Sequence, residues 1–170
     1  MTRVRGVVGS LGPFVALLFL LAGCTADPGP EDAAGGQDQV GEQQVGVRPA
    51  TEGLVPEGAA APDELEVEDL IAGEGAAAAD GDVLVVHYVG LRWSDGEQFD
   101  ASWDREQPLE FQLGAGQVIE GWERGVEGMQ LGGRRVLTIP PEQAYGDRGS
   151  PPAIGPGETL VFVVDLVEIR

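Results

Sequence analysis

The chain has 170 residues and a formal net charge of −19, with 29 acidic residues against ten arginines and no lysine. Nucleic-acid binding needs a basic surface, so this charge argues against nucleic acid as a partner. Cys24 is the single cysteine, which excludes an intrachain disulfide. The length allows one domain of ordinary size with additional segments.

Residues 1–23 have the pattern of a secretory signal. Arg3 and Arg5 precede the apolar run Leu11–Leu21, which is short for a membrane span of about 20 residues. The run ends in Leu-Ala-Gly-Cys, which resembles the lipobox of bacterial lipoproteins, whose cysteine is diacylated after cleavage. We therefore expect a lipoprotein signal peptide and a lipidated Cys24, which anchors the protein outside the cytoplasm on the bacterial cell membrane. A plain signal peptide with an incidental cysteine and a short uncleaved anchor are the alternatives.

Residues 24–62 differ in composition from residues 63–170. They are rich in Ala, Gly, Gln, Pro and acidic residues, and they contain no aromatic residue. Their few aliphatic residues follow no sustained period, so the segment cannot bury enough apolar surface to offset the entropy of ordering. We expect a flexible acidic tether that holds one globular domain, residues 63–170, away from the membrane.

Five stretches of the domain have strand-like patterns. They are residues 65–71, 83–91, 108–113, 134–139 and 159–169. In the last stretch, Leu160, Phe162, Val164 and Leu166 fall on one face and Asp165 on the other. Strands without intervening helices indicate an antiparallel sheet, and a lone amphipathic helix must bury its apolar side against that sheet. The predicted fold class is therefore α+β.

The helix is predicted in QVIEGWERGVEGM, residues 117–129, and its composition is unusual. The apolar residues Ile119, Trp122, Val126 and Met129 fall at helical steps. Three glycines interrupt them, and each glycine costs a helix interior up to ~1 kcal/mol relative to alanine. We expect Val126 and Met129 to face the sheet. We expect Gly121 to let a backbone or a ligand approach closely.

Standard catalytic sets are missing from the sequence. It has no GxSxG motif, and its carboxylates are scattered without a spacing that marks an acid–base pair. His87 is the only histidine and lies in a strand-like run, so we interpret it as structural. We expect no metal and no cofactor. Tyr145, by contrast, lies in the Gly- and Pro-rich loop 140–157, where aromatic side chains are usually displayed.

Seven blocks of sequence carry a family resemblance. They are VVHYVG (85–90), DGEQFDAS (95–102), PLEFQLG (108–114), QVIEGWERGVEGM (117–129), RRVLTIP (134–140), AYGDRG (144–149) and TLVFVVDLVEI (159–169). In this order and spacing they closely resemble the FKBP-type peptidyl-prolyl cis-trans isomerases, over about residues 63–170. The resemblance implies a five-stranded antiparallel half-barrel sheet wrapped around one short α-helix. It also implies rotation of X–Pro bonds in unfolded or exported polypeptides, without covalent chemistry.

The resemblance also implies a set of site residues. Trp122 would form the floor under the proline ring. The groups implied to act on the substrate are the backbone N–H of Ile119, the Tyr145 hydroxyl and the carboxylate of Asp100. Arg105 would be the ion-pair partner of Asp100. The other residues implied to bind substrate are Tyr88, Phe99, Phe111, Val118, Ile154 and Phe162. The family also suggests macrolide ligands and a monomer.

Three positions depart from the best-known family pattern. Leu109 stands where an aromatic residue is common, Gln117 where Glu is common, and Ala153 where a β-branched residue often lines the pocket. We expect these changes to affect substrate preference and macrolide affinity more than the reaction. The alternative to an enzyme is a non-catalytic module that binds proline segments or acts as a holdase, and a purely structural role is a third possibility.

Overall fold

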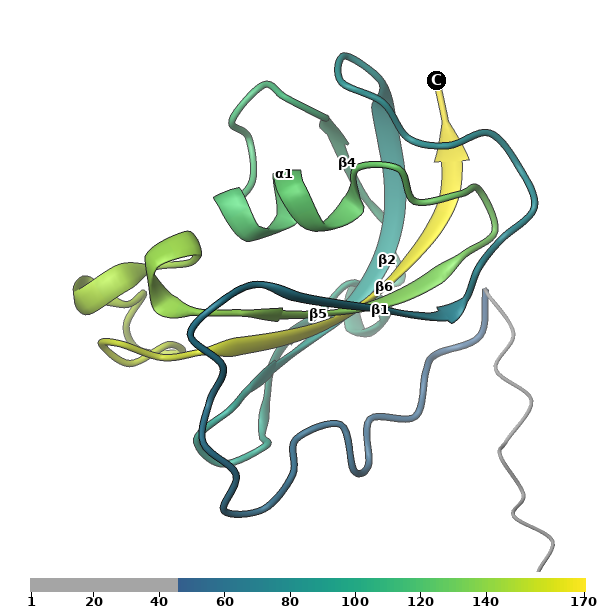
Figure 1. Ribbon diagram of the computed structural model, residues 1–170. Helices are drawn as coiled ribbons and strands as arrows, with labels where there is room; N and C mark the ends of the chain where they lie inside the picture. Colours follow the sequence, from purple (N-terminus) through teal and green to yellow (C-terminus); the bar gives the residue numbers. More distant parts are fainter. Residues whose placement is uncertain (1–45) are drawn as a thin grey trace, which may run out of the picture. The chain divides into compact units, whose positions relative to one another are not determined.

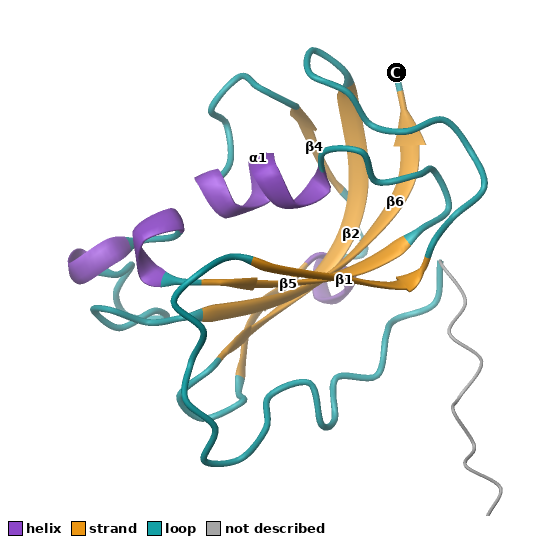
Figure 2. Cartoon of the chain, in the orientation of Figure 1, coloured by secondary structure: helices purple, strands orange, loops and turns teal. Residues whose placement is uncertain are grey.

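A computed structural model describes residues 46–170 (Figure 1). The predicted signal peptide, Cys24 and the first part of the predicted tether lie outside the described residues. The described part forms an antiparallel sheet, one α-helix and short 3₁₀ helices (Figure 2). Within residues 46–170, no helix is long and apolar enough to cross a membrane.

The elements follow one another in a simple order. The strands are β1 (Glu66–Ile71), β2 (Val83–Arg92), β3 (Gln98–Ala101), β4 (Leu109–Gln112), β5 (Arg134–Ile139) and β6 (Leu160–Ile169). The α-helix is α1 (Glu120–Val126), and the 3₁₀ helices are η1 (Ser102–Arg105), η2 (Pro141–Gln143) and η3 (Gly146–Arg148).

The sheet has the strand order β1-β5-β6-β2, and every pairing is antiparallel. On the remaining edge of β2, β3 pairs with residues 89–91 and β4 pairs with residues 83–86. Because β3 and β4 share this edge, they fill one position, and the sheet is five positions wide. The predicted α+β fold, with an antiparallel sheet around one short helix, is confirmed. The four-residue β3 was not predicted as a strand.

The two faces of the sheet have different coverings. Leu84, Val86 and Tyr88 of β2 face α1, whereas Val89 and Leu91 belong to a second apolar cluster on the opposite face. The predicted alternation in β6 is confirmed in the same way, because its even-numbered apolar residues join the cluster under α1. We call the face under α1 the inner face and the opposite one the outer face. Figure 1 shows α1 across the inner face.

The helix is shorter than predicted. It begins after Ile119, whose backbone is extended, and it ends before Gly128, which has a φ of +72°. Val126 and Met129 are buried in the inner-face cluster, as predicted. The seven-residue helix therefore depends on packing rather than on its own propensity.

Two helical glycines allow α1 to lie close to β5. A Cβ atom on Gly121 would overlap Cγ2 of Ile139, and one on Gly125 would lie 2.6 Å from Cδ2 of Leu137. The expectation of a close approach at Gly121 is therefore correct, but the neighbour is a β5 side chain. It is neither a backbone nor a ligand.

Arg135 attaches the end of α1 to the sheet. Its Nη1 donates to the carbonyl of Gly125 at 2.8 Å and to that of Glu127 at 3.3 Å. Its Nε and Nη2 donate to the carboxylate of Asp69 in β1 at 2.6 and 3.0 Å. A cation at a helix C-terminus is favourable because it meets carbonyls with no helical partner.

Residues 46–62, the described part of the predicted tether, contain no helix or strand. They run along the side of the sheet opposite α1, drawn in blue in Figure 1. Leu54 and Val55 pack against the apolar cluster of the outer face. This part of the segment thus makes specific contacts with the domain that its composition did not indicate.

Candidate functional site

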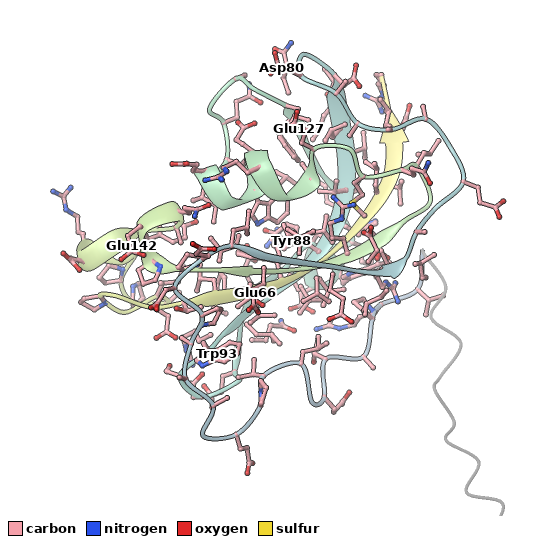
Figure 3. The ribbon with its side chains drawn as sticks, in the orientation of Figure 1. Glu66, Asp80, Tyr88, Trp93, Glu127 and Glu142 are labelled. Atoms are coloured by element: carbon pink, nitrogen blue, oxygen red, sulfur yellow. The ribbon has the colours of Figure 1, made fainter. Side chains whose placement is uncertain are left out.

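A cavity of about 190 Å³ opens at the inner face, beside α1. Its lining residues are Tyr88, Phe99, Asp100, Leu109, Gln117, Val118, Ile119, Trp122, Tyr145 and Phe162. The volume lies below the ~300 Å³ at which pockets for drug-sized ligands begin. The cavity therefore suits a small ring or a single side chain of a larger ligand. Figure 3 shows Tyr88 in the region between α1 and the sheet.

Trp122 forms the base of the cavity and is 3% exposed. Three rings meet its indole in edge-on geometry: Phe162 at 5.2 Å, Tyr88 at 5.3 Å and Phe111 at 5.8 Å between centroids. Edge-to-face pairs at these distances are favourable beyond the area that they bury. The floor is therefore a rigid apolar surface held from several strands.

Gly90 makes room for two walls of the cavity. Phe99 and Phe162 pack edge to face with centroids 5.6 Å apart. A Cβ atom on Gly90 would lie 2.7 Å from Cζ of Phe99 and 2.9 Å from Cε1 of Phe162. Any larger residue at position 90 would overlap these two rings and displace them.

A polar network lines one rim. The Tyr88 hydroxyl donates to Oδ2 of Asp100 at 2.5 Å, and Arg105 donates to Oδ1 of Asp100 and to the Tyr88 hydroxyl, the latter at 2.9 Å. The predicted Asp100–Arg105 ion pair is thus present. Burial and the hydrogen bond to Asp100 raise the pKa of Tyr88. The hydrogen bonds that Arg105 makes to Tyr88 and Asp100 raise the pKa of Arg105. The network therefore holds the carboxylate of Asp100 in a fixed position beside the cavity.

Two hydrogen-bond donors at the cavity have no partner among the described residues. The carbonyl of Ile119 accepts from the N–H groups of Trp122 and Glu123, at 2.9 and 3.2 Å, whereas its own N–H precedes the helix. The Tyr145 hydroxyl is on a side chain that is 40% exposed. Both residues line the cavity, so a carbonyl group bound there could accept from these donors.

The loop that carries Tyr145 is attached to the turn between β2 and β3. Arg92 donates to the carbonyl of Ala153 at 3.1 Å and also pairs with Asp95 at 2.9 Å. Ser94 donates from its N–H and its hydroxyl to the carboxylate of Glu158, both at 3.0 Å. These bonds hold both the tip and the base of the loop.

Eight of the eleven predicted site residues line the cavity, and three do not. Arg105 lies behind Asp100, Phe111 supports Trp122 from within the core, and Ile154 is buried in the inner-face cluster. Leu109 and Gln117 line the cavity and were absent from the predicted set. Their departure from the family pattern was the signal that could have included them.

His87 lies on the outer face and away from the cavity. Its ring stacks on Trp103 with centroids 4.2 Å apart, and its Nδ1 lies 2.9 Å from the hydroxyl of Ser102. The structural role predicted for it agrees with these contacts. Among residues 46–170, no group of three His, Cys, Asp or Glu side chains is placed to hold a metal ion.

A second hollow of about 430 Å³ lies between residues 55–59 and the turn 93–96. It is larger than the cavity beside α1, but Trp93 is its only aromatic lining residue and much of its wall is Gly, Ala or acidic. The smaller cavity combines an aromatic floor with free donors. We therefore identify the smaller one as the candidate site.

Known proteins resemble this chain over the same region. The family model of FKBP-type peptidyl-prolyl cis-trans isomerases matches residues 74–167. An FK506-binding protein of Streptomyces anulatus is 57% identical over 109 residues, covering 64% of this chain and 88% of that protein. An FK506-binding protein of Neisseria meningitidis is 49% identical over 106 residues, covering 62% of this chain and 95% of that protein.

Solved structures agree with this relationship. The crystal structure of AtFKBP13 is 37% identical with a TM-score of 0.60, covering 65% of this chain and 96% of that one. The structure of FkpA from Escherichia coli is 43% identical with a TM-score of 0.57, covering 62% of this chain and 48% of that one. The cavity, the sheet around α1 and these matches lead to one conclusion: the chain belongs to the FKBP-type peptidyl-prolyl cis-trans isomerase family.

Proposed function

We propose that the protein accelerates cis–trans rotation of X–Pro peptide bonds in exported polypeptides. The observation that supports this most is an aromatic cavity lined by two residues, Ile119 and Tyr145, that each carry a donor without a partner among the described residues. Rotation of a peptide bond has a barrier of ~18–20 kcal/mol because the amide loses its resonance as it twists. No bond is broken, so the reaction requires no nucleophile.

The cavity can lower this barrier by binding the twisted amide better than the planar one. A planar amide is more dipolar than a twisted one, so an apolar surface such as the Trp122 indole disfavours the planar form. Donors that meet the substrate carbonyl only in its rotated position stabilise the transition state selectively. We assign this role to the Ile119 N–H and the Tyr145 hydroxyl.

Asp100 has an electrostatic or orienting role in this proposal. Its carboxylate is held by Tyr88 and Arg105 at the rim, and proton transfer is not part of the reaction. Arg105 and Phe111 support the lining residues from behind. Ile154 acts through the core and does not touch the substrate.

Peptide isomerisation by the full chain in detergent tests the proposal. Tetrapeptides with varied residues before proline should exchange faster than the uncatalysed background. Trp122→Leu should remain folded and bind proline peptides more weakly. Proline peptides that bind the wild type without any acceleration would refute the enzyme and leave the non-catalytic binding module.

Macrolide binding is a separate part of the proposal. The names of the two relatives describe them as FK506-binding proteins. Leu109 and Gln117 line the cavity here, so we expect macrolide affinity to depend on these two positions. Titration of FK506 against the wild type and Leu109→Phe, followed by Trp fluorescence, would measure this.

We expect the polypeptide substrates to be unfolded, and we expect the protein to bind them as a monomer.

We also propose that Cys24 carries a lipid that anchors the protein outside the cytoplasm. Support comes from the charged start, the short apolar run and the Leu-Ala-Gly-Cys sequence alone. Two acyl chains hold a protein stably on a membrane, whereas one chain binds only marginally. Cys24→Ser should release the protein from the membrane fraction or block its processing. Unchanged acylation of that variant would refute the lipobox.

A further inference from the structure

The outer face of the sheet is apolar and covered by the chain's own residues. Its buried residues are Val89, Leu91, Ala101, Val136, Val161 and Val163. Leu54 and Val55 from the preceding segment pack on this cluster, together with Leu70, Trp93 and Trp103. Figure 3 shows Trp93 on the side of the sheet where this segment runs. An apolar sheet face left open would attract other chains.

The segment also completes a buried ion pair. Arg134 of β5 and Asp165 of β6 form a bidentate pair with distances of 2.5 and 2.6 Å, and their side chains are 2% and 1% exposed. The N–H of Gly46 donates to Oδ2 of Asp165 at 3.4 Å, and Arg134 donates to the carbonyl of Val47 at 2.6 Å. A buried ion pair is tolerated only when its remaining hydrogen-bonding groups are satisfied.

Further contacts attach the segment along its length. Arg48 donates to Asp104 and to Gln98, both at 2.5 Å. Arg48 thereby lowers the pKa of Asp104. Pro49 is buried, and the Trp93 indole N–H donates to the carbonyl of Ala59 at 3.3 Å. The contacts thus run from residue 46 to residue 59.

We propose that residues 46–59 are an intramolecular strap. The outer face is a docking surface whose occupant is this segment of the same chain, and the stable folded unit includes residues 46–59 in addition to the domain expected from residue 63. The matched family region begins at residue 74, so the strap is an addition outside it. The strap closes the outer face to other partners.

Two matched substitutions in the full chain test this proposal. Val55 is half-buried on the outer face, whereas Val47 is 59% exposed. Val55→Ser, alone and combined with Leu54→Ser, should lower the urea midpoint of unfolding. It should also lower the dependence of the free energy of unfolding on urea, because an undocked segment leaves less surface to be exposed on unfolding. Val47→Ser is the control and should leave both unchanged.

Proteolysis measures independently whether residues 46–59 are docked on the outer face. A glutamyl endopeptidase can cut after Glu52 and Glu57, which are present in all these variants. We expect cleavage at these two sites to be at least tenfold faster in Leu54→Ser/Val55→Ser than in the wild type or Val47→Ser. Failure of the double variant to fold would also support the strap, because residues that form only a free tether have no influence on folding.

The opposite results would overturn the proposal. Wild-type cleavage as fast as that of the double variant, with equal urea midpoints, would show that residues 46–59 do not dock. Isomerisation of proline peptides should stay within about twofold of wild type in all three variants, because the cavity lies on the inner face. A wild type without isomerase activity would refute the proposed function and leave the strap unaffected.

Discussion

Trp122 illustrates how a single residue can serve both the core and the site. Its indole is buried by three aromatic neighbours, and the same ring forms the base of the cavity. A leucine would favour the helix slightly more but would present a smaller, rounded surface. The flat surface of the indole therefore explains why a tryptophan stands at position 122, although it lowers the helix propensity slightly.

Tyr145 should affect catalysis without affecting stability. We predict that Tyr145→Phe lowers kcat/KM about five- to twentyfold, which corresponds to one hydrogen bond of ~1–1.8 kcal/mol. The melting temperature should stay the same, because the hydroxyl has no partner among the described residues. Peptide isomerisation and thermal unfolding measure the two effects. An unchanged kcat/KM would remove Tyr145 from the catalytic set.

Tyr88 should make stability depend on pH in the alkaline range. Its pKa in the folded state is raised by burial and by Asp100, so the unfolded state loses the proton at a lower pH than the folded one. The resulting stability is fully present below about pH 10 and is lost as the pH rises through the raised pKa. Tyr88→Phe should lack this loss.

The protein offers a direct spectroscopic measurement of this pKa. It has two tyrosines, so Tyr145→Phe leaves Tyr88 as the single phenol that absorbs on ionisation. Titration of that variant near 295 nm should give a pKa above the ordinary value of tyrosine. A value at or below 10 would contradict the hydrogen-bonded arrangement at the rim.

At the scale of elements, α1 is held by its neighbours. It contains two glycines, it is seven residues long, and Arg135 attaches its C-terminal carbonyls to β1. A helix of this length has little stability of its own in water. Its position beside the cavity is therefore set by contact with β5.

Gly121→Ala should destabilise the protein although alanine favours helices. Propensity would gain up to ~1 kcal/mol, but the new methyl group would overlap Ile139, and overpacking a core costs ~1–3 kcal/mol. We expect a net loss in the free energy of unfolding. In the double variant Gly121→Ala/Ile139→Ala, the loss should be smaller than the sum of the single losses. Additive losses in urea unfolding would show that the two residues do not meet.

The sequence predicted some elements well because their patterns are local. The alternation in β6 and the helical spacing around Trp122 each appear within a few residues, and both agree with the structure. The predicted set also located most of the cavity, since the family motifs carry those residues. The Arg134–Asp165 pair could not be predicted, because it depends on the register between β5 and β6.

Other parts depend on contacts that no local pattern shows. β3 has four residues and becomes a strand by pairing with β2. Residues 46–59 contain few apolar side chains, and their packing is decided by the outer face that they meet. The family resemblance implies that Ile154 binds substrate, whereas in the structure its side chain is buried in the inner-face cluster. Two backbone hydrogen bonds between Ser150 and Ile154 fold the tip of this loop.

At the scale of the whole molecule, the negative charge should make stability sensitive to salt. Residues 63–170 contain 22 acidic residues and seven arginines, so repulsion among acids outweighs the exposed ion pairs, which contribute little. The Debye length falls to ~8 Å at 0.15 M ionic strength. We predict that the melting temperature rises as NaCl increases from 0.01 to 0.3 M, measured by circular dichroism. A fall would show that the ion pairs dominate.

The central position of β6 has a consequence for biosynthesis. β6 is the last strand in the sequence, yet it lies between β5 and β2 and pairs with both. Because synthesis runs from the N-terminus to the C-terminus, β1 to β5 are made first. The strand that lies between β5 and β2 is missing until residues 160–169 have been made. The sheet cannot close during most of synthesis.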